Sequence, residues 1–95
     1  MQASRLGTEG TSATERRSRM DIICTILKAI GDSDRGARKT YILYRSNLSH
    51  PMLNRYLDFV IECGLVKAEK LVYYIGEKGL EFIRAYERMR GILES

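Results

Sequence analysis

Basic side chains gather in the middle of this 95-residue sequence, and such side chains bind anions. From Arg35 to Leu57 the chain carries five Arg or Lys residues and His50, and from Arg35 onward no Asp or Glu appears until Asp58. A continuous basic stretch attracts a polyanion and raises its local concentration. The net charge of the whole chain, +4, has the same sign. These residue types therefore predict binding of a polyanion.

Catalytic and metal-binding chemistry is poorly supported. His50 with Cys24 or Cys63 could form a nucleophilic pair, but both cysteines fall in apolar helical patterns, whereas His50 falls at an exposed helix start. One histidine and two separated cysteines do not make an ordinary zinc site. The chain also lacks a glycine-rich phosphate loop and a nucleotide fingerprint. We predict no enzyme activity, no metal, no cofactor and no small-molecule substrate.

The sequence carries no pattern for export or for membrane insertion. No apolar run reaches the roughly 18 residues of a spanning helix. The amino terminus lacks the apolar core of a secretory signal. Cys24 and Cys63 are far apart, which indicates buried free thiols in a reducing compartment. We expect a cytoplasmic protein with no membrane partner.

A helix-turn-helix is predicted around the basic stretch. Its first helix starts at an Asp34 cap and ends near Arg45, and the turn covers residues 46–48. Ser49 is a favourable N-cap for the second helix, and Pro51 is tolerated in its first turn. The apolar spacing of this second helix predicts the following buried face: Leu53, Tyr56, Leu57, Val60 and Ile61. Asn54, Arg55 and Asp58 then face outward.

Two further elements flank the helix-turn-helix. A helix precedes it, with two possible capping boxes at its start, Ser12 with Glu15 or Ser18 with Asp21. We favour the range 15–30, closed by Gly31. After the second helix ends at Gly64, residues 65–68 and 71–75 predict a short antiparallel hairpin joined by residues 69–70.

The last predicted helix spans residues 77–94. Its residues Phe82, Tyr86, Met89 and Leu93 are spaced four, three and four apart, which is typical of a coiled-coil seam. These four residues form the predicted interface of a homodimer. The alternative is a helix that packs only on its own domain, and Leu80 and Ile83 can contact that domain in either case.

The order of these elements predicts the fold class and the domains. The chain is mostly α (α+β): a winged helix-turn-helix with a short hairpin wing and a C-terminal coiled-coil helix. We assign residues 1–14 to a flexible tail, because this stretch is rich in Gly, Ser and Thr without an apolar period. Residues 15–76 form the winged helix-turn-helix domain, and residues 77–95 the dimerisation helix.

Three segments carry a resemblance to a known family. RKTYILYRSNLS, RYLDF and YYIGEKG resemble small archaeal winged-helix DNA-binding proteins of about 10 kDa, and the match covers residues 16–93. The resemblance implies a homodimer held by an antiparallel coiled coil, which binds duplex DNA with little sequence preference. It also implies a nucleoid-associated chromatin protein or transcriptional regulator. Two departures are a longer segment before the first helix and a shorter last helix, and the second of these leaves the spacing of the two DNA-binding ends open.

In the helix-turn-helix mode the second helix lies in the major groove, and its first residues approach the base edges. Arg55 or Asn54 could then read guanine or adenine, although phosphate contacts are the commoner kind. The residues predicted to face the groove are Ser49, His50, Asn54 and Arg55. Those predicted to contact the DNA backbone are Arg38, Lys39, Arg45, Ser46 and Asn47 on one side, and Lys67 and Lys70 on the wing.

Two other functions fit the same pattern. A winged helix can serve as a protein-binding module without nucleic acid, in which case Tyr41, Tyr44, Tyr73 and Tyr74 would offer an aromatic patch. RNA binding is a third possibility, but the sequence has no aromatic-studded RNA-recognition strand and no glycine clamp loop.

Overall fold

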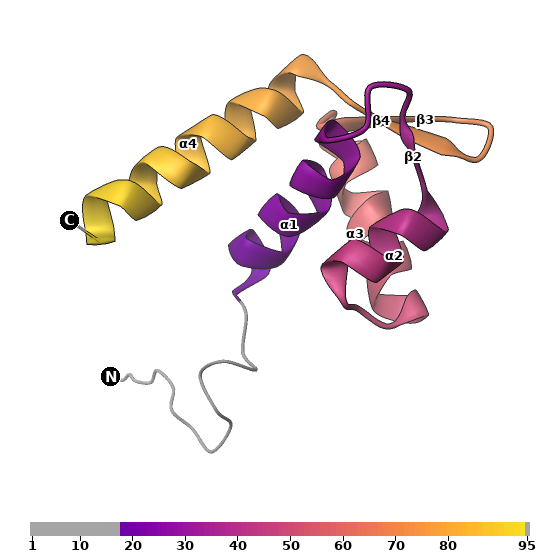
Figure 1. Cartoon of the computed structure of the whole chain (residues 1–95), viewed down its shortest axis with the longest axis horizontal. Coiled ribbons are helices and arrows are strands. Elements are labelled where there is room, and N and C mark those ends of the chain that lie inside the picture. Colours follow the sequence, from indigo (N-terminus) through magenta and orange to yellow (C-terminus); the bar gives the residue numbers. More distant parts are fainter. Residues whose placement is uncertain (1–17, 95) are drawn as a thin grey trace.

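The structure, a computed structural model, describes residues 18–94, which form four helices and a three-stranded sheet (Figure 1). The predicted tail, residues 1–14, lies outside the described residues. The mostly helical architecture with a hairpin wing is confirmed. The elements in chain order are α1 (Arg19–Gly31), β2 (Ala37–Arg38), α2 (Lys39–Ser46), α3 (His50–Glu62), β3 (Val66–Glu69), β4 (Val72–Ile75) and α4 (Glu77–Glu94).

Helix α1 begins at the later of its two possible starts. The Ser18 hydroxyl accepts a hydrogen bond from the Asp21 backbone N–H at 3.0 Å, and the Asp21 carboxylate accepts one from the Ser18 N–H at 3.4 Å. This capping box satisfies two N–H groups that have no partner within the helix. The favoured start at Glu15 was therefore wrong. The buried side of α1 supplies much of the core: Ile22, Ile23, Ile26, Leu27 and Ile30.

Strand β2 was not predicted, and it replaces the expected start of α2. Residues 37 and 38 pair with β4, so α2 begins only at Lys39, and Arg38 occupies its N-cap without a side-chain hydrogen bond. The predicted cap at Asp34 was wrong. The loop before β2 passes close over the sheet at Gly36, where φ is +89° and an added Cβ would lie 2.4 Å from Val72 Cγ1. Only glycine fits there.

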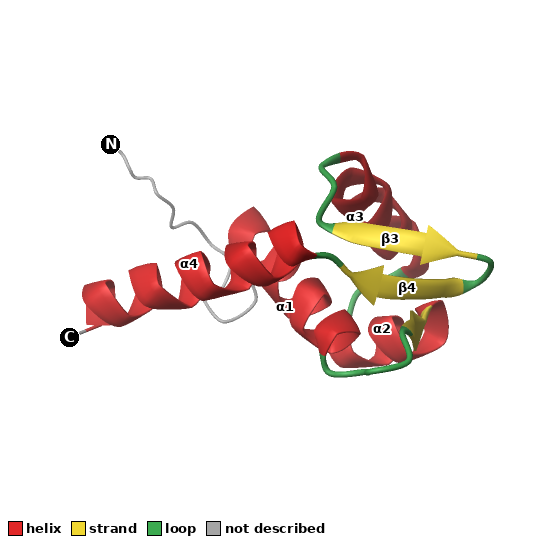
Figure 2. Cartoon of the chain, turned by 90° about the horizontal axis from the view of Figure 1, so that it is seen from above, coloured by secondary structure: helices red, strands yellow, loops and turns green. Residues whose placement is uncertain are grey.

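The sheet has the order β2-β4-β3, and both pairings are antiparallel. Val66 lies opposite Ile75 and Glu69 opposite Val72, so residues 70–71 connect the strands, one position later than predicted. Figure 2 shows the two strands of this hairpin beside α3, with their connection at the end of the molecule opposite α4.

Helix α4 occupies the predicted residues and packs on α1. Gly79 allows a close approach, since a Cβ there would lie 2.4 Å from the Leu65 carbonyl oxygen. Further along, Tyr86 is buried and Glu87 forms an ion pair with Lys28 of α1. Helix α4 therefore contacts the rest of the domain from Gly79 to Glu87.

Candidate nucleic-acid interface

Helix α3 has the cap and the buried side that its sequence predicts. The Ser49 hydroxyl accepts a hydrogen bond from the Met52 N–H at 3.3 Å, and Pro51 lies in the first turn. Leu53, Leu57 and Val60 are buried, whereas Tyr56 and Ile61 are half-buried. The outward side carries the four residues predicted to face a groove, all exposed: Ser49, His50, Asn54 and Arg55.

The second half of α3 is acidic on its outward side. Asp58 and Glu62 are exposed and follow Arg55 by three and seven residues, which places all three on neighbouring turns of one helix side. A polyanion that approaches this side is attracted at its start and repelled at its end.

The turn between α2 and α3 depends on Asn47. This residue adopts a left-handed conformation with φ 58°, and its N–H donates a hydrogen bond to the Leu43 carbonyl at 3.0 Å. Asn47 is exposed, whereas the preceding Ser46 is fully buried and its hydroxyl lies 3.4 Å from the same carbonyl. Placing Ser46 at the surface was an error, because packing within the domain leaves this residue with no exposed surface.

Arg45 is exposed but has partners within its own chain. Its guanidinium donates to the Asp32 carboxylate at 2.9 Å and to the Tyr41 hydroxyl, and it lies 5.5 Å from the centroid of the Tyr41 ring. The hydrogen bond to Asp32 raises the pKa of Arg45 above its ordinary value, so the group stays charged. A phosphate at Arg45 would have to compete with Asp32.

Three other cations lie on the wing and beside it. Arg38 pairs across the sheet with Val72, the residue that follows the hairpin connection, so its backbone lies next to the wing tip. Lys70 is at that tip with φ 57°. Lys67 lies on the same sheet face as Glu69 two residues later, which offsets part of its charge. The wing tip is therefore more basic than the wing itself.

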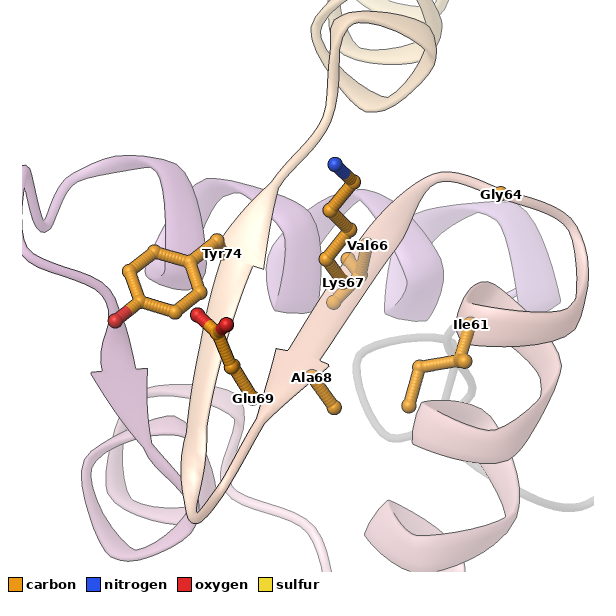
Figure 3. A pocket seen from close by; sticks show the side chains of 7 residues that line it. All are labelled: Ile61, Gly64, Val66, Lys67, Ala68, Glu69 and Tyr74. Carbon is orange, nitrogen blue, oxygen red and sulfur yellow. The ribbon is translucent and has the colours of Figure 1, made fainter.

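A groove of about 580 Å³ opens between α3 and the wing (Figure 3). Ile61 of α3 forms one side, and Ala68 lies between it and the Glu69 and Tyr74 side chains. Its lining is mainly apolar, with one cation and one carboxylate. This composition does not favour an anion in the groove itself.

A second groove, of about 560 Å³, separates α1 from α3. Arg19 and Arg55 both line it, and neither forms an ion pair with any residue of the described range 18–94. Between them are exposed apolar side chains, among them Met52 and Phe59. Sequence reasoning did not connect Arg19 with Arg55, because their proximity depends on how the two helices pack.

Comparison with known proteins identifies the family. The model of the family described as winged helix-turn-helix matches residues 16–94. The chain belongs to the winged helix-turn-helix family. An uncharacterized protein from Methanocaldococcus jannaschii is 29% identical over 80 residues, covering 84% of this chain and 80% of that protein. The crystal structure of Sso10a-2, a DNA-binding protein from Sulfolobus solfataricus, superposes with a TM-score of 0.67 at 25% identity, covering 82% of this chain and 83% of that one.

These comparisons confirm the predicted resemblance to small archaeal winged-helix proteins. In the described part of the chain, no three His, Cys, Asp or Glu residues are grouped as a metal site would require. No helix among the same residues is both long and apolar enough to cross a membrane.

The predicted seam on α4 divides into two parts. The Phe82 and Tyr86 rings stack with centroids 6.3 Å apart, and Tyr86 is only 8% exposed because its own chain covers it. Beyond the contact with α1, Met89 is 46% and Leu93 75% exposed. Leu80, predicted to pack on the domain, is also exposed, whereas Ile83 packs against the core. Tyr86 has little surface left for a partner.

Both cysteines are free thiols. Cys24 is buried between α1 and α4, and this burial raises the pKa of its thiol. Cys63 is half-buried, and its carbonyl accepts a hydrogen bond from the Lys78 ammonium at 2.8 Å. Neither thiol lies beside His50 in a described pocket or hydrogen bond, so the structure offers no nucleophilic pair among residues 18–94.

Proposed function

We propose that this winged helix binds double-stranded DNA, with α3 in the major groove and the wing on the adjacent backbone. One observation carries the proposal: Arg38, Arg55 and Lys70 are exposed and have no ion pair with any residue in the range 18–94. These cations belong to the helix-turn-helix and the wing, where a phosphate backbone would pass in the docking mode of this motif. The DNA binding of Sso10a-2 supports the same conclusion.

Phosphate contacts supply most of the affinity in this proposal. Arg38, Lys39 and Asn47 contact the backbone on the α2 side, and Lys67 and Lys70 contact it on the wing side. Arg45 joins them only by exchanging Asp32 for a phosphate. Ser46 is removed from the set because its side chain is enclosed.

The start of α3 approaches the base edges. Ser49, His50 and Asn54 lie on its first turns, and Arg55 extends the same exposed surface. Asn54 and Arg55 have the donor patterns that pair with adenine and guanine. Because Asp58 and Glu62 repel phosphates, the first half of α3 lies deeper in the groove than the second half.

A homodimer through α4 is part of the proposal. Met89 and Leu93 follow Tyr86 along the predicted seam of α4 and, unlike Tyr86, are exposed and open to a second copy. Burial of two such side chains from each of two chains, at about 1.5 to 3 kcal/mol for each side chain, stabilises the dimer by roughly 6 to 12 kcal/mol. Association costs about 4 to 15 kcal/mol. We therefore expect a concentration-dependent dimer, in which Phe82 and Tyr86 contribute mainly by supporting the helix.

Two linked DNA-binding ends raise avidity, which suits a nucleoid-associated chromatin protein or transcriptional regulator. The test is a fluorescence-anisotropy titration of a mixed-sequence duplex at several salt concentrations. With about six phosphates neutralised per winged helix, the logarithm of affinity falls against the logarithm of salt with a slope near −5. No binding at micromolar protein, or a slope near zero, would contradict the proposal.

The second candidate is a protein-binding winged helix, and one observation favours it. Tyr44 is 82% and Tyr41 40% exposed on α2, whereas Tyr73 and Tyr74 are half-buried in the sheet, so the aromatic patch is limited to α2. The same titration separates the two functions, because a protein-binding module gives no anisotropy change with duplex DNA. RNA binding, the third possible function, is tested by adding duplex RNA as a competitor to the complex of the protein with duplex DNA.

A further inference from the structure

The tip of the wing carries a leucine that has no role in the fold. Leu71 is 75% exposed and does not belong to the hydrophobic core or to the side chains packed against it. It lies in the two-residue connection between β3 and β4, at the end of the hairpin furthest from α4 (Figures 1 and 2). A leucine in this position keeps its apolar surface in water, which is unfavourable.

The backbone of the tip is also unusual. Lys70 adopts φ 57°, a conformation that side chains other than Gly, Asn and Asp rarely take. Two-residue hairpin connections favour Asn-Gly, Asp-Gly or a leading Gly. A connection built only for stability would not use Lys-Leu, and backbone strain of this kind concentrates at functional sites. Two independent features, the strain and the exposed leucine, thus meet at the same place.

The surroundings of Leu71 are basic. Lys70 precedes it, and Arg38 lies opposite Val72, the residue that follows it, while Glu69, which lies opposite Val72 on the other side, offsets part of this positive charge. Both cations lack an ion pair with residues 18–94. An exposed apolar side chain at a tip that also carries two unpaired cations matches a ligand that has an apolar interior between two rows of phosphates. The minor groove of DNA has this character, because stacked bases lie between its two backbones.

We propose that Leu71 is a wedge that enters the minor groove and partly unstacks one base step, so that the duplex bends away from the wing. This inference rests on the proposed DNA binding and deepens it. Arg38 and Lys70 hold the phosphates on either side of the step. Apolar wedges of this kind cost stacking free energy and are favoured at flexible pyrimidine–purine steps. The wing therefore selects deformable DNA without reading a base edge.

The experiment uses the full chain and two duplexes of mixed sequence that differ only in one central step, TA in the first and AA in the second. Each duplex carries 2-aminopurine beside that step, whose fluorescence rises on unstacking, and a donor–acceptor pair at its ends to report bending. The variants are Leu71→Ala, which removes the wedge, and Leu71→Met, which keeps an apolar side chain. Leu80→Ala is the matched control, because Leu80 is an exposed leucine on α4.

We expect the wild-type chain, Leu71→Met and Leu80→Ala to raise the fluorescence and the end-to-end energy transfer on the TA duplex. Leu71→Ala binds with an affinity lower by less than about tenfold. The variant loses the burial of the leucine, but the base step that it no longer unstacks keeps its stacking free energy. Leu71→Ala raises neither signal and no longer distinguishes the two duplexes. Equal signals from Leu71→Ala and the wild-type chain on DNA that both bind would overturn the wedge alone. A wild-type chain that binds neither duplex would overturn the proposed function and the wedge with it.

Discussion

The two ends of the molecule differ in which of their Arg and Lys side chains form ion pairs with carboxylates. At the α1–α4 end, Lys28 pairs with Glu87, and Arg90 pairs with Glu94. At the end formed by α2, α3 and the wing, Arg38, Arg55 and Lys70 have no ion pair with a residue of the range 18–94. A cation already paired with a carboxylate gains less from a phosphate than an unpaired one does. Arg19 of α1 and Arg84 and Arg88 of α4 also have no ion pair with a residue of the range 18–94, so pairing only weakens the contribution of single cations. The docking mode of the helix-turn-helix, and not the net charge of +4, is what points to the α2, α3 and wing end.

Arg45 is the exception at the helix-turn-helix end, because Asp32 neutralises it. The α1–α4 end differs from the helix-turn-helix end in its apolar side chains as well as in its cations. Tyr86 is buried at the α1–α4 end, where α4 packs on its own chain, whereas Leu93 on the same helix is open. One end of the molecule is therefore suited to packing and assembly, and the other to an anion.

The largest expected effect is on stability and comes from a substitution in the contact between α1 and α4. Tyr86→Glu removes a buried ring and leaves a carboxylate in its place, which lowers the free energy of unfolding by about 3 to 5 kcal/mol. Leu93→Glu changes the free energy of unfolding of the single chain by less than about 0.5 kcal/mol, because this side chain is exposed there, so both variants are compared at a protein concentration at which the dimer dissociates. Thermal or urea unfolding followed by circular dichroism measures both values.

Leu93→Glu also tests the assembly. Light scattering on a size-exclusion column should show a folded monomer that binds DNA more weakly than the dimer, because avidity is lost. An unchanged molar mass for Leu93→Glu would show that the open part of α4 is not the interface. An unchanged stability for Tyr86→Glu would contradict the packing of α4 on α1.

The next largest effect is on DNA affinity and compares the loss of unpaired cations with the loss of a paired one. Arg38→Ala combined with Arg55→Ala removes two charge-assisted contacts, each worth about 1.5 kcal/mol or more, so affinity for DNA falls roughly a hundredfold. The salt slope becomes shallower by about 2. Lys28→Gln removes one charge from the paired end and should leave both quantities nearly unchanged. If Lys28→Gln weakens binding as much as the double variant, net charge and not the location of the charge governs affinity.

The smallest effect concerns the acidic end of α3. Asp58→Asn with Glu62→Gln removes repulsion of phosphates and should raise affinity several-fold, since each exposed charge interaction is worth about 1 kcal/mol or less. The increase should shrink as salt rises. Glu81→Gln on α4, which is also exposed, is the control and should change affinity far less. An unchanged affinity for the Asp58 and Glu62 variant would mean that this side of α3 faces away from DNA, and a lower affinity would mean that the two carboxylates do not repel it.

The local signals of the sequence were sufficient for α3 and α4. Ser49 with Pro51 marks the start of α3, and Gly64, with φ +80°, follows its end. Gly76 before Glu77 marks the start of α4. Such caps depend on residues within one turn of each other, so they can be recognised without knowing the fold.

The errors arose where distant segments meet. Strand β2 is two residues long, too short for any period, and only its pairing with β4 defines it. Asp32 pairs with Arg45 thirteen residues later, so a phosphate at Arg45 would have to displace a carboxylate that the local sequence does not reveal. Ser46 is enclosed by packing that its own sequence neighbours do not reveal. The hairpin connection moved by one residue because Lys70 takes a conformation that is uncommon for lysine.

The most direct test of the central claim is to map which backbone amides respond to DNA. A labelled chain is titrated with a short duplex, and amide chemical shifts are followed by NMR. The account predicts shifts in residues 37–39, 47–55 and 67–71, with Lys28 and the 84–90 segment unchanged. Shifts confined to α1 and α4, around Lys28 and Arg90, would contradict it.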